Sequence, residues 1–249
     1  PAHDAQPIEN AGDGTEVAVI CDVTAFHAEG GGQLGDIGTI TAPTGVIEVT
    51  VTKKLPDGAT IMVGNVVEGT VAVGEEVTFA VQSNRKNDIA RNHTATHLLH
   101  AALKQVLGSH VNQAGSYVGP DRLRFDFSHF SQVTEAELKE VEAIVNEEIL
   151  AGKDVAIEEL PIEEAKKRGA TALFGEKYGD VVRVVTVPEF SMEFCGGSHV
   201  SNTAQIGMFK IISEASTGAG VRRIEAVTGH GAVEHVNATE AMVKGLAVE

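Results

Sequence analysis

Two short motifs that lie far apart in the sequence place the strongest constraint on how this chain can fold. The first is His93-Thr-Ala-Thr-His97, and the second is Cys195-Gly-Gly-Ser-His199. On a helix, the i, i+4 spacing puts both imidazoles of the first motif on one face. The two glycines of the second motif allow a tight turn that can bring its thiolate and its imidazole to the same centre. A fold that unites the two motifs therefore builds one site from three imidazoles and one thiolate.

A metal ion is the ligand that this set of side chains favours. A tetrahedral ion that accepts both nitrogen and sulfur ligands is most naturally zinc, with iron or cobalt as alternatives. Taken alone, a histidine pair on a helix is more often a surface or core feature, so the prediction depends on both motifs together. The motif of zinc peptidases has Glu directly after its first histidine. Thr94 stands at that position here, which argues against a peptidase.

The first third of the chain alternates β-branched runs with glycine-containing turns. Short strands at close spacing, with turn residues between them, are typical of a small antiparallel barrel or sandwich. We therefore predict a glycine-rich β-barrel module over residues 1–82. Its strands are expected at residues 16–23, 38–40, 46–51, 59–63, 69–73 and 76–81.

Helices and strands are mixed over residues 83–229, which we predict to form the metal-binding core of an α+β fold. One helix is expected to begin at Ser83 or Asn84 and to carry the first histidine motif. A second helix is expected after Thr134, which forms a capping-box pattern with Glu137. A short helix is expected at residues 161–169, and strands are expected at 111–118, 123–127, 154–160, 181–187, 208–213 and 221–228.

Residues 230–249 are expected to begin a C-terminal helix with little to bury it, so we expect the chain to be a fragment of a longer protein. No apolar run is long enough to span a bilayer, and no secretion signal precedes the strands. Cys21 and Cys195 do not make a disulfide framework. These features predict a cytoplasmic protein without a membrane partner.

A glycine-rich segment, Phe26-His-Ala-Glu-Gly-Gly-Gly-Gln33, is the second unusual motif. Glycines let a backbone approach a ligand closely, and the Gln33 side chain offers both a hydrogen-bond donor and an acceptor. The segment could therefore contact a bound ligand. The alternative is a β-bulge or a hairpin turn.

Charge is distributed unevenly along the chain. There are 35 acidic and 19 basic residues, for a formal net charge of −16. Only residues 85–130 and 165–229 are net positive, and they contain the two metal-ligand motifs. A polyanion could approach there, although scatter in a small sample explains the pattern equally well. Arg222 and Arg223 could contact an RNA backbone, or could be ordinary solvated side chains.

Four segments together resemble the editing domain of bacterial alanyl-tRNA synthetases and the related freestanding AlaX proteins. The segments are residues 26–36, 91–97, 195–199 and 220–226. They occur in the order found in that family, and the likeness extends from residue 15 to residue 230. We find no resemblance to the aminoacylation domain and therefore expect that the chain does not form alanyl adenylate.

The resemblance implies an editing core with a zinc site between helix and sheet. It implies hydrolysis of the aminoacyl ester of mischarged Ser-tRNA(Ala) and Gly-tRNA(Ala). The zinc ligands implied are His93, His97, Cys195 and His199. The implied partners are the acceptor end of tRNA(Ala) and the remainder of the synthetase.

The predicted substrate pocket contains three residues, with no residue assigned as general base. Thr96 and Gln113 match residues of the family's editing pocket, and Gln33 joins them from the glycine-rich segment. The sequence departs from the family at His27 and Gly30, where tyrosine and serine are common. The Thr96 hydroxyl could meet a serine side chain, or could instead bond back to the carbonyl of residue 92.

Editing has a clear physical reason, because a site built for alanine discriminates only weakly against serine or glycine. The competing hypothesis is a non-catalytic tRNA-binding module with a structural zinc. Four protein ligands already complete a tetrahedral shell, which favours that alternative.

Overall fold

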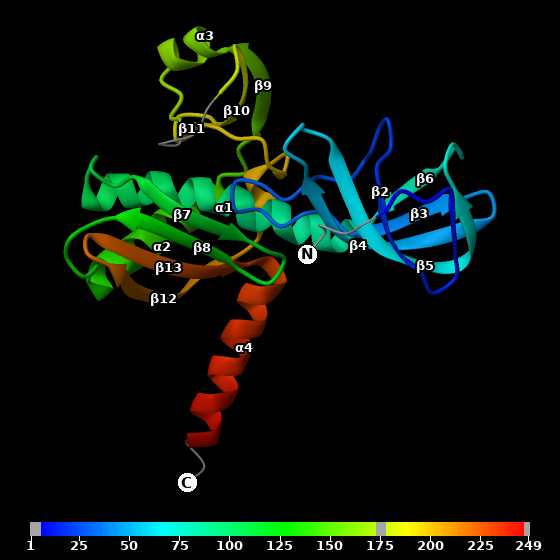
Figure 1. Ribbon diagram of the computed structural model, residues 1–249. Coiled ribbons are helices and arrows are strands. Elements are labelled where there is room, and N and C mark those ends of the chain that lie inside the picture. Colours follow the sequence, from blue (N-terminus) through cyan, green and yellow to red (C-terminus); the bar gives the residue numbers. More distant parts are fainter. Residues whose placement is uncertain (1–5, 173–177, 247–249) are drawn as a thin grey trace. The chain divides into compact units, whose positions relative to one another are not determined.

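The computed structural model describes residues 6–172 and 178–246. The chain divides into two compact units, which are drawn in Figure 1. The first unit contains Pro1–Gly30 and Leu34–Lys86, and the second contains Gly31–Gln33 and Asn87–Glu249. Residues 31–33 thus belong to the second unit, although their neighbours in the sequence belong to the first.

The first unit is an antiparallel sheet of six strands. They are β1 (Asn10–Gly12), β2 (Glu16–Val19), β3 (Gly38–Ala42), β4 (Gly45–Lys54), β5 (Thr60–Ala72) and β6 (Thr78–Val81). The strand order is β1-β5-β4-β3-β6, and β2 also pairs with β5. Among the described residues, β6 pairs with β3 and not with β1, so the predicted barrel is wrong and the sheet is open. The terminal strands have only three and four residues, which leaves few backbone groups to close it.

Strand β5 is one continuous strand of 13 residues where two shorter strands were predicted. Its glycines make close approaches to the neighbouring strand rather than a turn. A Cβ atom on Gly64 would lie 1.9 Å from the carbonyl oxygen of Glu48, and one on Gly69 would lie 2.0 Å from that of Thr44. Gly69 also has a φ of 68°, which other residues rarely adopt. Glycine at these positions therefore lets β5 pass β4.

The second unit combines two antiparallel sheets with helices. Its elements are α1 (Ser83–Leu107), which begins in the first unit, then β7 (Gln113–Val118), β8 (Leu123–Ser128), α2 (Glu135–Leu150), β9 (Ala156–Pro161), α3 (Ile162–Lys167), β10 (Val181–Val187), β11 (Ser191–Phe194), the 3-10 helix η1 (Thr203–Ile206), β12 (Phe209–Gly218), β13 (Val221–Thr228) and α4 (Gly229–Leu246). One sheet has the order β12-β13-β8-β7, and the other has the order β11-β10-β9. The α+β class is therefore confirmed.

Helices α1 and α2 pack on one face of the four-stranded sheet, as the first two figures show. Leu99 and Leu103 of α1 are fully buried there with Phe125 of β8. The predicted capping box begins α2, because Glu137 N donates to Thr134 Oγ1 and Thr134 N donates to the Glu137 carboxylate. This packing holds α1 in place as the scaffold of the first histidine motif.

The motif from Cys195 to His199 directly follows a strand of the three-stranded sheet. Strand β11 pairs with β10 over four residues and ends at Phe194, directly before Cys195. Strand β11 was not predicted, because a four-residue strand beside a glycine turn shows little periodicity. The strand is nevertheless the element that brings the cysteine motif to α1.

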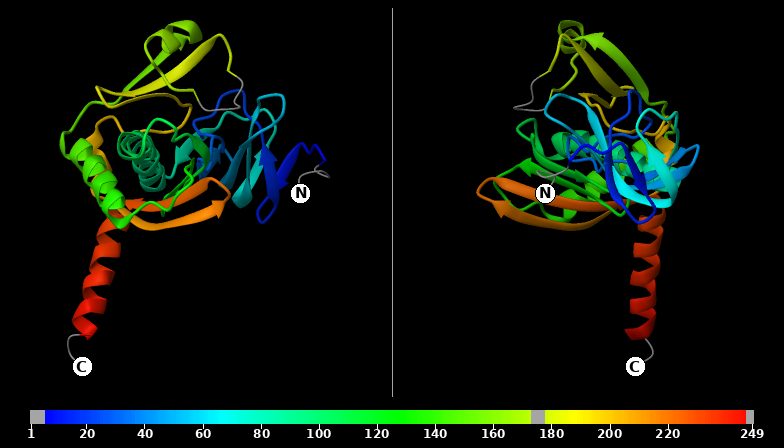
Figure 2. Two further views of the ribbon diagram at one scale, coloured as in Figure 1. Left: turned by 90° about the vertical axis from the view of Figure 1, so that its left-hand side faces the viewer. Right: turned by 45° about the vertical axis from the view of Figure 1, so that its right-hand side comes forward.

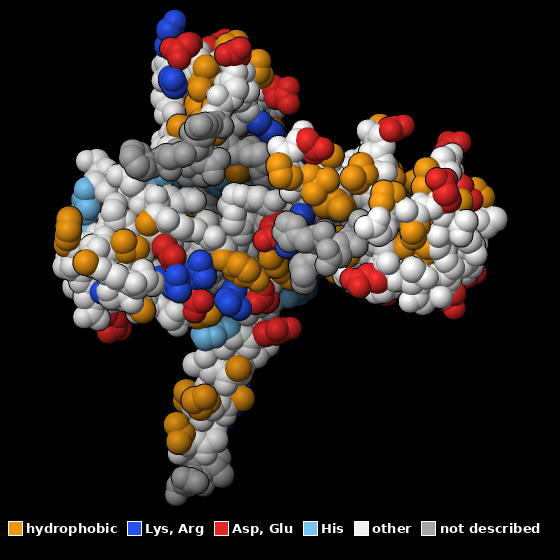
Figure 3. Space-filling model, viewed as in Figure 1, with side chains coloured by type: hydrophobic (Ala, Val, Ile, Leu, Met, Phe, Trp, Pro, Cys, Tyr) orange, Lys and Arg blue, Asp and Glu red, His pale blue; other side chains and the backbone are white. Residues whose placement is uncertain are grey.

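Helix α4 extends from the end of β13, as Figure 2 shows, and Ala232 is its one buried residue among those described. Val233, Met242, Val243 and Leu246 of this helix are exposed. Figure 3 shows hydrophobic side chains along it. None of the helices in the described part of the chain is long and apolar enough to cross a membrane.

Candidate metal centre

Helix α1 places His93 and His97 one turn apart in the interior of the second unit. Each side chain is buried, and the two ring centroids are 5.4 Å apart. The neighbouring Asn92 ties this turn of the helix to the sheet. Its side-chain amide donates to the Gly119 carbonyl oxygen and accepts from the Thr228 hydroxyl. The predicted placement of both imidazoles on one helix face is confirmed.

An arginine fixes the backbone of the segment from Cys195 to His199, and a glycine lets this segment pass close to α1. Arg183 donates from Nη1 to the carbonyl oxygens of Cys195 and Gly197, at 2.7 and 2.8 Å. A Cβ atom on Gly197 would lie 2.1 Å from Cε1 of His93. The motif therefore needs a glycine at this position so that its backbone can pass the imidazole ring.

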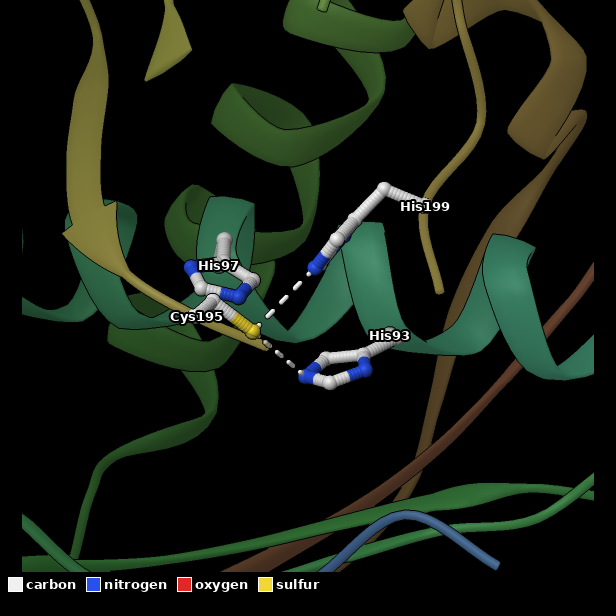
Figure 4. Close-up of side chains that lie close together, drawn as sticks. All are labelled: His93, His97, Cys195 and His199. Carbon is white, nitrogen blue, oxygen red and sulfur yellow. Dashed lines mark hydrogen bonds between the residues drawn. The ribbon is translucent and has the colours of Figure 1, made fainter. Parts of the chain in front are cut away.

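The four side chains converge on one point, as Figure 4 shows. Cys195 Sγ lies 3.4 Å from Nε2 of His93 and 3.2 Å from Nε2 of His199. One ligand atom from each of His93, His97, Cys195 and His199 lies within 4.8 Å of all the others. This group is the one cluster of three or more potential metal ligands among the described residues.

The donor set fits a tetrahedral ion with mixed nitrogen and sulfur ligands. Zinc forms bonds of about 2.3 Å to sulfur and about 2.0 Å to nitrogen. In a tetrahedral arrangement, these lengths place a sulfur and a nitrogen ligand about 3.5 Å apart. The two sulfur–nitrogen separations observed here are 3.2 and 3.4 Å. The cluster therefore already has close to the spacing that such an ion requires.

The Nδ1 atom of each imidazole contacts a polar side chain outside the cluster. His93 Nδ1 lies 2.7 Å from Oε1 of Gln33, and His199 Nδ1 lies 3.1 Å from the Thr94 hydroxyl. His97 Nδ1 lies 2.7 Å from Oε2 of Glu193. In His93 and His199 these contacts occupy the ring nitrogen opposite the one that contacts Cys195 Sγ. The His97–Glu193 contact is a close ion pair without hydrogen-bond geometry.

Electrostatic coupling within the cluster sets its protonation. Burial opposes ionisation of the Cys195 thiol, but His93 and hydrogen bonds from the imidazoles lower the pKa of Cys195 to about 2. Burial also opposes charge on His97, but the Glu193 carboxylate raises the pKa of His97 to about 10. Burial and the neighbouring imidazoles lower the pKa of His199 to about 3. Despite its own burial, Glu193 has a pKa well below its usual range because His97 and His100 face it.

The three predicted pocket residues occupy different environments. Gln33 is fully buried, and both ends of its amide are used: Ser198 N donates to its Oε1, and its Nε2 donates to Ser198 Oγ. The Thr96 hydroxyl donates to the Asn92 carbonyl oxygen at 2.8 Å, which is the alternative that sequence reasoning left open. Gln113 begins β7 opposite Phe127, and no hydrogen bond joins its side chain to the cluster within the described residues.

The two arginines considered for RNA contact are paired with carboxylates. Arg222 donates to both oxygens of Glu214, and Arg223 donates to both oxygens of Asp126, at 2.7 and 2.8 Å. Figure 3 shows basic and acidic side chains intermixed on this surface of the second unit. Local ion pairing therefore offsets the charge that the sequence suggested for an RNA backbone.

Sequence reasoning missed Thr94 and Glu193. Thr94 was noticed only as the residue that replaces a catalytic glutamate, and Glu193 had no role. Glu193 stands two residues before Cys195, so alternation along a strand would have placed both on the same face. Recognition of β11 as a strand would have supplied that signal.

Two family models match separate parts of the chain. Residues 182–225 match the family described as "Threonyl and Alanyl tRNA synthetase second additional domain". Residues 2–85 match "tRNA synthetases class II (A)".

The chain is similar along most of its length to curated alanine-tRNA ligases. The chain is 54% identical over 246 residues to the enzyme of Bacillus subtilis (strain 168) and 53% identical over 247 residues to that of Bacillus velezensis, with 99% of this chain aligned in both cases. It is 57% identical over 230 residues to the enzyme of Bacillus pumilus, with 92% of this chain aligned. The chain spans 28% of the length of the first two relatives and 26% of the third. The predicted resemblance to alanyl-tRNA synthetase is confirmed.

Proposed function

We propose that this chain edits mischarged tRNA(Ala) by hydrolysing the aminoacyl ester of Ser-tRNA(Ala) and Gly-tRNA(Ala), with zinc held by four side chains. The observation that carries the proposal is the convergence of His93, His97, Cys195 and His199 on one point of the second unit. The identity to alanine-tRNA ligases supports tRNA(Ala) as the substrate carrier. The acceptor end of that tRNA and the rest of a synthetase are the proposed partners.

Zinc supplies a Lewis acid that can polarise an ester carbonyl and favour ionisation of water. The protein side chains would hold the amino acid and select among substrates. The Thr96 hydroxyl donates to Asn92, so its oxygen keeps lone pairs that can accept a hydrogen bond from a seryl hydroxyl. An alanyl group cannot make that bond. We propose Gln113 as a further pocket residue and retain Gln33 as a residue of the site.

The direct test is deacylation by the zinc-loaded chain. We expect Ser-tRNA(Ala) to lose its ester faster with the protein than in buffer, and Ala-tRNA(Ala) to be spared. The matched control is the same protein after metal removal, which should be inactive until zinc is restored. A serine ester that decays at the buffer rate in the presence of fully loaded protein contradicts the proposed hydrolysis.

A second candidate function is non-catalytic binding of tRNA with a structural zinc. The observation in its favour is that four protein ligands would complete a tetrahedral shell. It predicts that the loaded chain binds tRNA(Ala), with affinity falling as salt rises, but leaves every ester intact. Binding and deacylation measured on the same sample distinguish the two functions.

A further inference from the structure

We propose that Gln33, Thr94 and Glu193 are positioning residues that hold the three imidazoles with Nε2 toward the metal, and that Glu193 is the strongest of them. The inference rests on the metal centre of the proposed function and does not depend on the substrate. Each of the three side chains contacts the Nδ1 atom of a different histidine.

The chemical reason is the tautomer of a neutral imidazole. Only one ring nitrogen carries a proton, and the other offers the lone pair that binds a metal. An acceptor at Nδ1 keeps the proton there and leaves Nε2 free. Nε2 is the nitrogen of His93 and of His199 that faces Cys195 Sγ. Outer acceptors of this kind orient ligands and contribute to metal affinity.

Gln33 positions His93 and the cysteine motif at once. Its Oε1 atom is 2.7 Å from His93 Nδ1 and accepts from Ser198 N at 2.8 Å. With its Nε2 donating to Ser198 Oγ, the amide is oriented so that the oxygen must face the imidazole. The glycines before Gln33 allow this approach, because a Cβ on Gly32 would lie 2.4 Å from the Ser116 carbonyl oxygen. This environment leaves Gln33 buried behind the ligand.

Glu193 serves two imidazoles with its two carboxylate oxygens. Oε2 lies 2.7 Å from His97 Nδ1, and Oε1 lies 2.8 Å from His100 Nδ1. His100 is buried against Phe125 and is not one of the four ligands. Its contact holds the second oxygen and so keeps the carboxylate facing His97 rather than the metal. The charge of a buried carboxylate attracts a ring N–H more strongly than a neutral oxygen does, because the surroundings have a low dielectric constant.

Thr94 is the weakest of the three by geometry. Its Oγ1 atom is 3.1 Å from His199 Nδ1, and it also accepts from Val200 N at 3.2 Å. The oxygen is therefore shared between an imidazole and a backbone amide. Removal of the hydroxyl should cost less metal affinity than loss of the amide of Gln33 or the carboxylate of Glu193.

Zinc affinity, measured without tRNA by competition with a chromophoric chelator, tests the inference on the full chain. Because zinc also displaces a proton, the titration is repeated over a range of pH to obtain a dissociation constant free of proton competition. We expect that constant to rise about 100-fold in Glu193→Leu, about 30-fold in Gln33→Leu and about 10-fold in Thr94→Val. Glu193→Gln keeps the size of the side chain but offers one acceptor to two imidazoles, so it should fall between wild type and Glu193→Leu.

Thr52→Val is the matched control, because it removes a buried hydroxyl of the first unit that bonds a carbonyl oxygen and no imidazole. Its zinc affinity should equal that of the wild type. Nitrogen-15 spectra of the zinc-loaded wild type should show a proton on Nδ1 of all three ligand histidines. Cobalt-loaded Glu193→Gln should retain tetrahedral absorption bands, which shows that the site has folded.

Each outcome has a defined meaning. Zinc affinities of Glu193→Leu and Gln33→Leu within about twofold of the wild type would overturn the positioning role. So would a proton on Nε2 of a ligand histidine in the loaded wild type. Failure of the wild type to bind zinc rejects the metal centre itself. Zinc affinities in the expected order together with intact esters reject only the proposed deacylation.

Discussion

The second unit contains two groups of contacting histidines that differ in their surroundings. At the candidate metal centre, His93 and His97 are buried, His199 and the Cys195 thiol are half-buried, and each Nδ1 lies close to a polar side chain. His110 and His129 also meet closely, with His110 Nε2 2.9 Å from His129 Nδ1 and the rings stacked. His110 is exposed, and the only other side chain bonded to the pair's ring nitrogens among the described residues is Ser131.

The difference teaches that proximity of imidazoles does not by itself make a metal centre. The His110–His129 pair contacts through one nitrogen of each ring, and no Cys, Asp, Glu or third His joins it among the described residues. The buried group combines a complete donor set with outer contacts that orient it. Changes at the two places should therefore have very different consequences for metal binding.

The largest effect is expected from Cys195→Ala. The change removes the one thiol of the cluster, so we expect zinc affinity to fall at least 100-fold and deacylation to be lost. Metal content and ester hydrolysis measure the outcome. Cys21→Ala is the matched control, because Cys21 packs against the core of the first unit. Equal zinc content in Cys195→Ala and wild type would remove Cys195 from the ligand set.

Gly197→Ala should have the next largest effect. The added methyl group would lie 2.1 Å from Cε1 of His93, so the imidazole or the backbone must shift. We expect a 10- to 100-fold loss of zinc affinity, about that of an outer contact. Gly196→Ala provides the control, because a Cβ there meets nothing within 4 Å. Similar losses in both variants would show that the turn, and not the ring contact, matters.

Zinc binding should depend on pH through His97. Without metal, this imidazole has a pKa of about 10, so it is protonated at neutral pH and zinc must displace the proton. Cys195 and His199 have lowered pKa values and release none. Affinity should therefore rise about tenfold per pH unit below that pKa and level off above it. Calorimetry in two buffers of different ionisation enthalpy would count the proton, and pH-independent affinity near neutrality would contradict the assignment.

Thr96→Val should change selectivity rather than metal binding. The variant keeps the shape of the side chain and removes the oxygen proposed to accept from a seryl hydroxyl. We expect the preference for Ser-tRNA(Ala) over Ala-tRNA(Ala) to fall about tenfold, the value of one buried hydrogen bond. Rates for both esters measure this preference at equal zinc content. An undiminished preference would exclude Thr96 from substrate recognition and leave its bond to Asn92 as its role.

The smallest effect is expected from His110→Ala combined with His129→Ala. This surface pair contributes no ligand to the buried cluster, so zinc stoichiometry and affinity should match the wild type. Metal analysis of the double variant is sufficient. Loss of one bound zinc equivalent would show that the His110–His129 pair binds metal. The two groups of histidines would then no longer differ in metal binding.

Local spacing made part of this site predictable. The i, i+4 histidines had to share a helix face, and the capping box at Thr134 and Glu137 had to begin a helix, because both depend on contacts within one turn. The cysteine motif could be matched to the histidines by donor chemistry alone. The open sheet of the first unit was not predictable, because strand periodicity does not show which edges pair.

The sequence by itself determined the four candidate ligands, the α+β class and the resemblance to alanyl-tRNA synthetases. Only the tertiary structure decided which side chains contact the Nδ1 atoms of the three candidate histidine ligands. Gln33 reaches His93 from 60 residues away, and Glu193 reaches His97 from a strand that carries no clear signal. It also paired Arg223 with Asp126, which are 97 residues apart. Residue type sets what a group can bond to, but long-range packing decides which partner it meets.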